Sequence, residues 1–298
     1  MWAQILEEII NGDTKALART ITLVENEYAG YEDFLQLLPV KSTPVIGITG
    51  PPGAGKSTLV DGLIAEILKQ NKKCAVLCVD PSSPFNLGAL LGDRIRMSNW
   101  YNHPDVFIRS LATRGSLGGL HPKIIEITDT VKAFPVDYII IETVGVGQSE
   151  IEIAGLADTT VVVIVPEAGD EIQTMKAGLM EIADIFVVNK SDRPDADLFV
   201  KNLRLMLAPS FSNHQYEIAI IKTIASEQKG LDELLEKIML HQQSGLNNDR
   251  KIFLLAEKAF HLIQNKRMKD IDKKKLKEEI SKQLKEPSFN LYRFVLNK

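Results

Sequence analysis

The fold is decided by the stretch Gly50-Pro51-Pro52-Gly53-Ala54-Gly55-Lys56-Ser57, which follows an apolar run at Val45–Thr49 and precedes a helical pattern at Thr58–Leu68. Glycines at this spacing, with a lysine and a hydroxyl between a strand and a helix, are typical of a phosphate-binding loop. Backbone N–H groups of such a loop turn toward the phosphates, and the positive end of the helix dipole faces the same anion. We therefore expect these residues and Thr58 to bind a nucleoside triphosphate, with Lys56 on the β- and γ-phosphates and the Ser57 hydroxyl on magnesium.

A second motif, Asn189-Lys190-Ser191-Asp192, follows the apolar run Ile185–Asn189 and indicates which base is bound. The Asp192 carboxylate can accept hydrogen bonds from the N1–H and the exocyclic amine of guanine, whereas adenine has an acceptor at N1 and no amine there. Buried polar groups that would lose their partners provide this kind of selectivity. Asn189 is expected to brace the loop, and the Lys190 stem to pack on the ring face. The motif therefore predicts GTP and GDP as ligands.

Magnesium and the γ-phosphate are expected at the end of a third apolar run, Tyr138–Glu142. Gly145 follows three residues later, where a backbone amide can contact the γ-phosphate so that hydrolysis releases the loop. The Glu142 carboxylate can hold the metal, directly or through water, or orient the attacking water. Asp80 and Asp93 can approach the same metal, and the alternative is that both are solvated carboxylates in turns.

Apolar runs alternate with amphipathic helical patterns from Pro44 to about His241, which predicts an α/β fold. The runs are apolar on both faces, as in strands that helices cover on both sides. We therefore expect a P-loop NTPase fold with a mostly parallel central sheet and ligands at the carboxyl ends of the strands. The expected strands are Val45–Thr49, Ala75–Val79, Tyr138–Glu142, Thr160–Val165 and Ile185–Asn189.

Helical extensions are expected at both ends of this domain. Apolar residues at helical spacing on either side of Asn11-Gly12-Asp13 predict two short helices, the second one capped by Asp13. Two further apolar stripes, at Ile252–Ile263 and Leu276–Leu284, predict helices near the C-terminus. The chain is accordingly divided into an N-terminal helical extension at 1–41, a P-loop GTPase domain at 42–243 and a C-terminal helical segment at 244–298.

Composition and charge narrow the classes of partner. The chain has 298 residues, a formal net charge of −4 and 25% charged residues, which gives no global electrostatic reason to bind nucleic acid or an anionic membrane. Acidic residues interrupt the lysine-rich segment Lys266–Lys285, as on a solvated helix face. The start is acidic and amphipathic, and no apolar run is long enough to span a bilayer, so we expect a cytoplasmic protein. Cys74 and Cys78 are expected to be buried thiols on one side of a strand.

Seven segments occur in the order GITGPPGAGKST, AVLCVDPSSP, LLGDRIRM, RSLATRGSLGGL, IIIETVGVGQSE, EAGDEIQTMKAGLMEIAD and VVNKSD. They resemble the methylmalonyl-CoA mutase-associated GTPases, the MeaB/ArgK type within the SIMIBI class of P-loop GTPases. With the N-terminal stretch NGDTKALARTITLVEN, the resemblance runs from about Ile9 to Leu240. It implies a homodimeric GTPase that binds an adenosylcobalamin-dependent acyl-CoA mutase, gates delivery of intact cofactor and helps to remove damaged cofactor. The mutase would hold the cobalamin.

The resemblance also implies roles for individual residues. Catalytic and magnesium-associated places fall on Lys56, Asp80, Asp93 and Glu142, and the metal-ligand place falls on Ser57. The stretch Val165–Lys176 resembles the switch through which the nucleotide state reaches the mutase, and its charged members are Asp170, Glu171 and Lys176.

The chain departs from the family pattern at three places. Glu167 stands where the pattern has Gly, and a side chain resists conformations that Gly permits. The base-contacting Ser-Ala pattern reads Thr223-Ile224-Ala225, so Ile224 departs while the Ala225 amide is expected to remain available to the base. The C-terminal part matches poorly and is short compared with the family's helical dimerisation arm, although its apolar stripes could pack on a second subunit.

Three other functions are alternatives to the one that this resemblance implies. Nickel-inserting GTPases need a cluster of Cys and His ligands, whereas the five histidines are scattered at His103, His121, His214, His241 and His261. A transport-associated kinase would need an acceptor site and no guanine selectivity, which Asn189 and Asp192 oppose. A pure nucleotide-sensing scaffold would hydrolyse GTP slowly and signal through its switch loops. Slow basal turnover of GTP is expected in any case, because no arginine is assigned to the γ-phosphate. The candidates Arg94, Arg96, Arg109 and Arg114 are expected only in surface or partner-facing roles.

Overall fold

The computed structural model describes residues 1–80, 97–114, 120–144, 153–168, 182–211, 218–244, 248–285, 289–296 and 298. The chain forms two compact units, Met1–Leu254 and Leu255–Lys298. The larger unit contains the central sheet and the described parts of the expected nucleotide-binding motifs.

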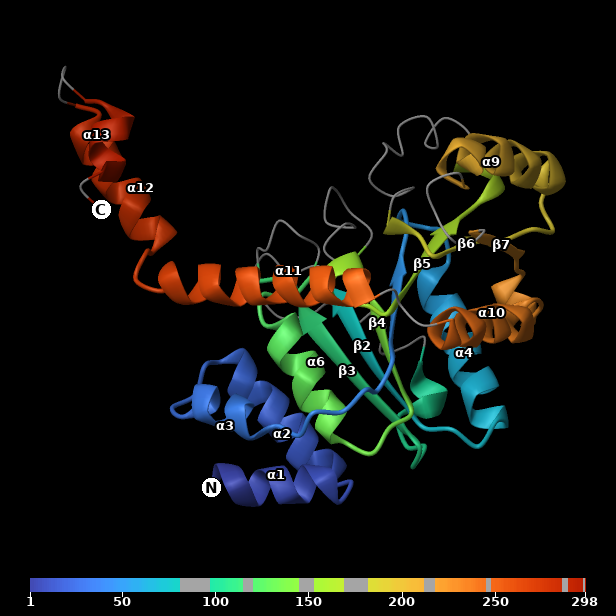
Figure 1. Ribbon diagram of the computed structural model, residues 1–298, viewed down its shortest axis with the longest axis horizontal. Coiled ribbons are helices and arrows are strands. Elements are labelled where there is room, and N and C mark those ends of the chain that lie inside the picture. The colour runs from blue at the N-terminus through green and yellow to red at the C-terminus, as the bar shows by residue number, and fades with distance from the viewer. Residues whose placement is uncertain are drawn as a thin grey trace. The chain divides into compact units, whose positions relative to one another are not determined.

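The larger unit is built on a seven-stranded sheet in which neighbouring strands are parallel, in the order β3-β2-β4-β1-β5-β6-β7 (Figure 1). The strands are β1 (Val45–Thr49), β2 (Cys74–Asp80), β3 (Val106–Ala112), β4 (Tyr138–Glu142), β5 (Thr159–Ile164), β6 (Ile185–Val188) and β7 (Ala219–Lys222). The five expected strands are present, with ends within one residue of the prediction. The expected α/β fold of the P-loop NTPase type, with a parallel sheet flanked by helices, is confirmed.

The sequence predicts neither β3 nor β7, and both lie at the edges of the sheet. β3 carries the partly exposed residues Ile108, Arg109 and Ser110 in its middle, and β7 has only four residues, of which Lys222 is exposed. Edge strands are less completely covered than central ones, so they lack the continuous apolar run by which the central strands are recognised.

Helices precede, separate and follow the strands. In the larger unit they are α1 (Trp2–Ile10), α2 (Thr14–Glu25), α3 (Tyr31–Leu37), α4 (Lys56–Lys69), α6 (Ile124–Ala133), α9 (Ala196–Phe211) and α10 (Leu231–Gln243), with 3-10 turns η1 (Ser98–Trp100), η3 (Pro166–Ala168) and η4 (Ala225–Glu227). Helix α11 (Asn248–Arg267) begins in the larger unit, and α12 (Lys273–Gln283) and α13 (Leu291–Leu296) belong to the smaller one.

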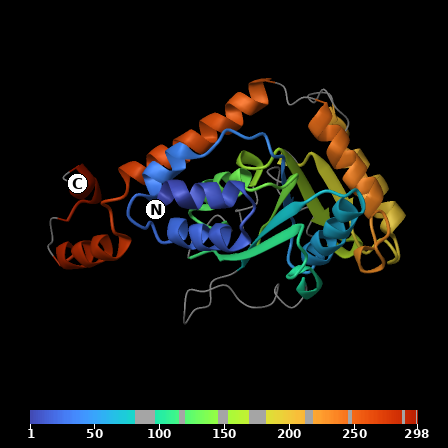
Figure 2. The same cartoon turned by 90° about the horizontal axis from the view of Figure 1, so that it is seen from below.

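The helices of the larger unit cover both faces of the sheet (Figure 2). On one face, α4 and α10 pack on a core that includes Ile46 and Ile48 of β1. On the other, α1, α2, α3 and α6 pack on a core that includes Val45, and α9 covers β5 and β6. Cys74 and Cys78 are fully buried on the α4 side, which confirms the prediction of buried thiols on one side of a strand.

The N-terminal extension has three helices where the sequence predicts two. Helices α1 and α2 are present as expected, and Asp13 accepts hydrogen bonds from the amides of Lys15 and Ala16 at 2.8 and 3.0 Å. Helix α3 has only seven residues, so its helical periodicity is too short to recognise, but its Phe34 is fully buried and packs with its ring centroid 4.9 Å from that of Trp2. The extension is therefore part of the main core.

The smaller unit is helical, as expected for the C-terminal segment. Phe294 is buried within it, and Lys298 forms an ion pair with Glu279. The apolar stripe of α11 is largely exposed, with 56% of Leu255 and 52% of Ile263 accessible. No helix in the described part of the chain has the length and apolar character needed to cross a membrane.

Candidate functional site

The phosphate-binding loop connects β1 to α4 and requires glycine at two positions. Gly50 has a φ of +139°, and a Cβ there would lie 2.0 Å from the backbone oxygen of Val163 in β5. Gly55 has a φ of +88°, and its Cβ would lie 2.4 Å from Nδ2 of Asn189. Because a side chain at either position meets fixed neighbours, glycine lets the loop pack closely against β5 and against the loop that follows β6.

Lys56, the first residue of α4, lies over this loop. Its Nζ donates to the backbone oxygens of Gly50 at 2.8 Å and Pro51 at 3.1 Å, and its side chain is buried. Burial in a low-dielectric environment strengthens the attraction between an ammonium and an anion. The cation is therefore positioned within the loop whose amides are expected to bind phosphate.

Ser57 and Glu142 meet at the carboxyl end of the sheet. Ser57 Oγ donates to Glu142 Oε1 at 2.7 Å, and both residues are buried. The Thr49 and Thr143 hydroxyls are 2.9 Å apart, so adjacent strands β1 and β4 are also linked just beside this pair. The structure thus brings together two of the four residues expected at the metal, although they are 85 positions apart in the chain.

Asp80 ends β2, the neighbour of β4, and is also buried. Its backbone oxygen accepts a hydrogen bond from the Thr113 amide at 3.0 Å, which fixes the end of β2 to the segment that follows β3. A hydroxyl and carboxylates at one edge of a sheet are the hard oxygen donors that suit magnesium, which commonly binds one or two carboxylates together with phosphate oxygens. The described residues contain no group of three or more His, Cys, Asp or Glu placed to hold a metal, so Ser57 and the phosphates would have to complete the site.

Asn189 joins the base motif to the phosphate loop. Its Nδ2 donates to the Ala54 oxygen at 2.8 Å, and its Oδ1 accepts from Thr223 Oγ1 at 3.0 Å and from the Ala225 amide at 3.1 Å. The side chain is 2% exposed. The Ala225 amide, expected from the sequence to be available to the base, therefore donates to Asn189, and its contact with the base stays a prediction.

Lys190 and Asp192 lie on the exposed side of the same motif. Lys190 has a φ of +56°, and its Nζ donates to the Gly53 oxygen at 2.8 Å, so its stem crosses from the base motif to the phosphate loop. Asp192 is exposed, as a carboxylate that receives a base must be before the base binds. A hydrogen bond from the Lys229 ammonium to Glu227 raises the pKa of Lys229, and the charge of Asp192 contributes to the same effect.

Glu167 forms an ion pair with Arg193, which follows Asp192. The pair joins η3, after β5, to the base motif, and the hydrogen bond from Arg193 lowers the pKa of Glu167. Both side chains are substantially exposed, so the pair contributes little to stability. Two expected site residues, Asp93 and Gly145, and the three charged residues of the switch segment, Asp170, Glu171 and Lys176, lie outside the described residues.

Of the four arginines with expected surface or partner-facing roles, Arg94 and Arg96 lie outside the described residues, and Arg109 and Arg114 contact helix α2. Arg109 donates to Glu25 Oε2 at 2.6 Å, and Arg114 donates to the Glu25 backbone oxygen at 3.0 Å. His121 Nε2 lies 3.6 Å from Glu25 Oε1. The sequence does not reveal this cluster, because its members come from α2, β3 and the segment before α6 and share no motif.

The profile of the family described as "Methylmalonyl Co-A mutase-associated GTPase MeaB" matches residues 17–278. A protein of Pyrococcus abyssi whose name describes it as a GTPase is 48% identical over 245 residues, which are 80% of this chain and 76% of that protein. GTPase ArgK of Escherichia coli is 34% identical over 80% of this chain and 75% of its own length.

Two further similarities extend this result. The fused isobutyryl-CoA mutase of Geobacillus kaustophilus is 35% identical over 283 residues, which are 88% of this chain but only 26% of that protein. The crystal structure of an LAO/AO transport system kinase superposes with a TM-score of 0.67 over 99% of this chain and 95% of the other, at 24% identity. The second similarity supports the fold alone.

Proposed function

This chain belongs to the family of methylmalonyl-CoA mutase-associated GTPases, and on that premise we propose that it is a GTP-hydrolysing chaperone that gates cofactor loading and protection of an adenosylcobalamin-dependent acyl-CoA mutase. The observation that carries the proposal is the similarity to a fused isobutyryl-CoA mutase, in which the matching region makes up 26% of one polypeptide. Fusion keeps two activities at a high effective concentration, which favours a working relationship between them. The partner is methylmalonyl-CoA mutase or a related enzyme.

The chain is a GTPase, and the proposed roles of its residues follow from their positions. Lys56 and the amides of the phosphate loop would offset the negative charge that spreads over the γ-phosphate oxygens in the transition state. Ser57, Asp80 and Glu142 would hold magnesium, which supplies positive charge beside the β- and γ-phosphates. Glu142 would also orient the attacking water, because it is buried and already held by the Ser57 hydroxyl.

Guanine recognition would use Asp192 for the base edge and Lys190 for the ring face, with Asn189 holding both loops together. Asp93 would join the magnesium site, and Gly145 would contact the γ-phosphate. Asp170, Glu171 and Lys176 would transmit the nucleotide state to the mutase. The segment 244–298 would form the arm of a homodimer, since exposed apolar residues on α11 are available for a second copy.

The decisive experiment measures GTP and ATP hydrolysis by the purified chain alone, with methylmalonyl-CoA mutase and with isobutyryl-CoA mutase. Transfer of adenosylcobalamin to the apo-mutase is followed in parallel by absorbance. We expect guanine preference, stimulation by one mutase and cofactor transfer that depends on GTP hydrolysis.

Two variants of α4 provide the matched comparison. Lys56→Ala should abolish hydrolysis and its control of transfer, whereas Lys69→Ala, at the exposed end of the same helix, should behave as the parent does. Guanine preference without any effect of either mutase would leave a GTPase but overturn the chaperone role.

A further inference from the structure

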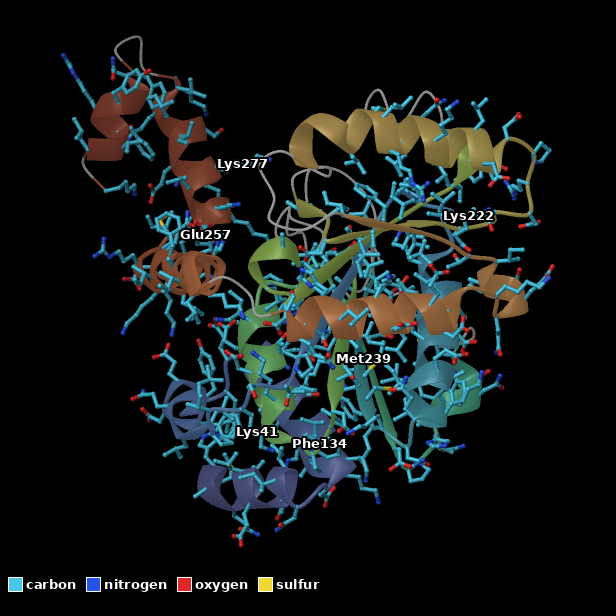
Figure 3. All side chains as sticks on the ribbon, turned by 45° about the vertical axis from the view of Figure 1, so that its right-hand side comes forward. Lys41, Phe134, Lys222, Met239, Glu257 and Lys277 are labelled. Carbon is cyan, nitrogen blue, oxygen red and sulfur yellow. The ribbon has the colours of Figure 1, made fainter. Side chains whose placement is uncertain are left out.

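A groove of about 360 Å³ lies between α9 and the edge strand β7, and none of its described lining residues is assigned to GTP. It is lined by Asp197, Val200, Lys201, Arg204, Leu205 and Lys222. Figure 3 labels Lys222 on the part of the sheet that α9 covers. The volume of the groove falls within the range of sites that bind small molecules or the side chains of a peptide.

The groove is basic in a chain whose net charge is −4. Lys222 Nζ forms an ion pair with Asp197 Oδ1 at 2.7 Å, which neutralises the one carboxylate among the described lining residues. Lys201 and Arg204 lie one helical turn apart on α9, and neither forms an ion pair with any residue that the structure describes. The groove therefore offers two positive charges to an incoming anion.

Apolar side chains accompany these cations. Of the apolar lining residues, Val200 is buried and Leu205 is 65% exposed. Leu198, which is 55% exposed, precedes Lys201 by three residues and Leu205 by seven. At this helical spacing the three side chains lie on one face of α9. A ligand that fits this face must combine negative charge with apolar surface.

The neighbouring strand suggests the form of such a ligand. Among the described strands, β7 pairs with β6 alone and forms an edge of the seven-stranded sheet (Figure 1). An edge strand can accept an extended segment from another chain, and the side chains of that segment then alternate between two faces. We propose that the α9–β7 groove docks an extended segment of a protein partner in which carboxylates stand beside apolar side chains.

The position of the groove connects docking to the nucleotide. Helix α9 begins four residues after Asp192, and Lys222 directly precedes Thr223, whose hydroxyl donates to Asn189. A segment bound to α9 and β7 therefore contacts both elements that hold the base motif, and its binding alters the rate of GDP release. This role goes beyond the proposed chaperone function, because it requires neither a mutase nor cobalamin.

The test uses the full chain and a fluorescein-labelled peptide of five Glu-Val repeats, with binding followed by fluorescence anisotropy. Peptides of five Lys-Val and five Glu-Gly repeats remove the negative charge and the apolar side chains in turn. The double variant Lys201→Glu/Arg204→Glu reverses the charge of the groove. Lys15→Glu/Arg19→Glu makes the same change on two exposed residues of α2 and is the matched control.

We expect the Glu-Val peptide to bind the parent at least tenfold more tightly than either other peptide. The groove variant should lose at least tenfold in affinity, the α2 variant less than twofold, and Leu205→Ser should lose affinity with unchanged folding. Saturating peptide should change the rate of release of fluorescent GDP at least threefold in the parent only.

Three outcomes would overturn the proposal, whatever the result of the mutase assays. They are binding of the Glu-Val peptide by the groove variant as tightly as by the parent, a loss of affinity in the α2 variant equal to that in the groove variant, and tighter binding of a single-stranded DNA ten-mer than of the Glu-Val peptide.

Discussion

Asn189 donates from Nδ2 to the backbone oxygen of Ala54 at 2.8 Å, so the base motif and the phosphate loop are held by one buried side chain. The opposite atom of the same amide accepts from Thr223 and Ala225. One residue thereby spans three loops at the carboxyl edge of the sheet. Loss of this side chain should disturb phosphate binding and base binding together.

Asn189→Ala is predicted to lower the free energy of unfolding by about 2–3 kcal/mol, since three buried polar groups lose a partner and each unsatisfied group costs roughly 1 kcal/mol or more. GTP and GDP should both bind at least about tenfold more weakly, because the two loops are no longer linked. Urea unfolding and titration with fluorescent GDP measure the two effects. Asn202→Ala, on the exposed face of α9, should change neither quantity, and a normal GDP affinity in Asn189→Ala would refute the linkage.

The hydrogen bond between Ser57 and Glu142 makes Glu142→Gln an informative substitution, because glutamine keeps an oxygen that can accept from Ser57 Oγ. The neutral amide cannot act as a base and binds magnesium weakly, so hydrolysis should slow by about a hundredfold or more. Folding and GDP affinity should change little. Single-turnover hydrolysis across a magnesium titration provides the measurement, with exposed Glu233→Gln as the control. Parental turnover at saturating magnesium would exclude Glu142 as the residue that orients the attacking water, and an unchanged magnesium dependence of turnover would exclude it from metal binding.

Asp192→Asn should exchange the preferred base rather than abolish nucleotide binding. The asparagine Oδ1 can still accept from N1–H, but its Nδ2 opposes the exocyclic amine of guanine and matches the C2 carbonyl of xanthine. The affinity of the variant for guanine nucleotides is therefore predicted to fall at least about tenfold, which corresponds to about 1.4 kcal/mol of binding free energy. Its affinity for xanthine nucleotides should rise. Competition between fluorescent GDP and unlabelled XDP measures the exchange. A parallel loss for both nucleotides would remove Asp192 from base recognition, and exposed Asp232→Asn should preserve guanine preference.

The sequence predicts best those parts of the fold and of the site that are formed by residues close together in the chain. The phosphate loop and the central strands follow from local spacing and from runs that are apolar on both faces. The partners of Asn189 do not, because Ala54 is 135 positions away and Ala225 is 36 positions away, and neither contributes a distinctive side chain. Only the parallel order of the strands brings their ends together.

The edge strands and the Glu25 cluster show a second reason why some features of the structure cannot be predicted from the sequence. β3 and β7 are incompletely buried, so their composition resembles that of a loop. Glu25, Arg109 and His121 are ordinary charged or titratable residues that become a unit only when α2 packs beside α6 and β3. Sequence patterns record burial and spacing along one element, whereas these contacts depend on how elements meet.

The buried histidine of this cluster predicts an acid sensitivity of folding. Burial lowers the pKa of His121 from 6.5 to about 4, and the charges of Arg114, Lys123 and Arg109 act in the same direction, against the nearby Glu25 carboxylate. Between these two pH values the unfolded chain binds a proton at His121 that the folded chain does not. Stability therefore falls as the pH drops from about 6.5 to about 4, and this residue's contribution to the fall ends below about 4.

The predicted loss from His121 is at most about 3 kcal/mol over that interval, because each pKa unit corresponds to about 1.4 kcal/mol. His121→Asn tests it, since the asparagine oxygen can replace Nδ1 as the acceptor for the Lys123 amide, a 3.0 Å contact, but does not titrate. Urea unfolding of parent and variant at pH 7 and pH 4.5 should show a smaller acid loss in the variant. Exposed His261→Asn should retain the parental acid loss. If His121→Asn lost as much stability as the parent between these two pH values, the acid sensitivity would have to come from carboxylates, because their titration is common to both proteins and only the imidazole differs.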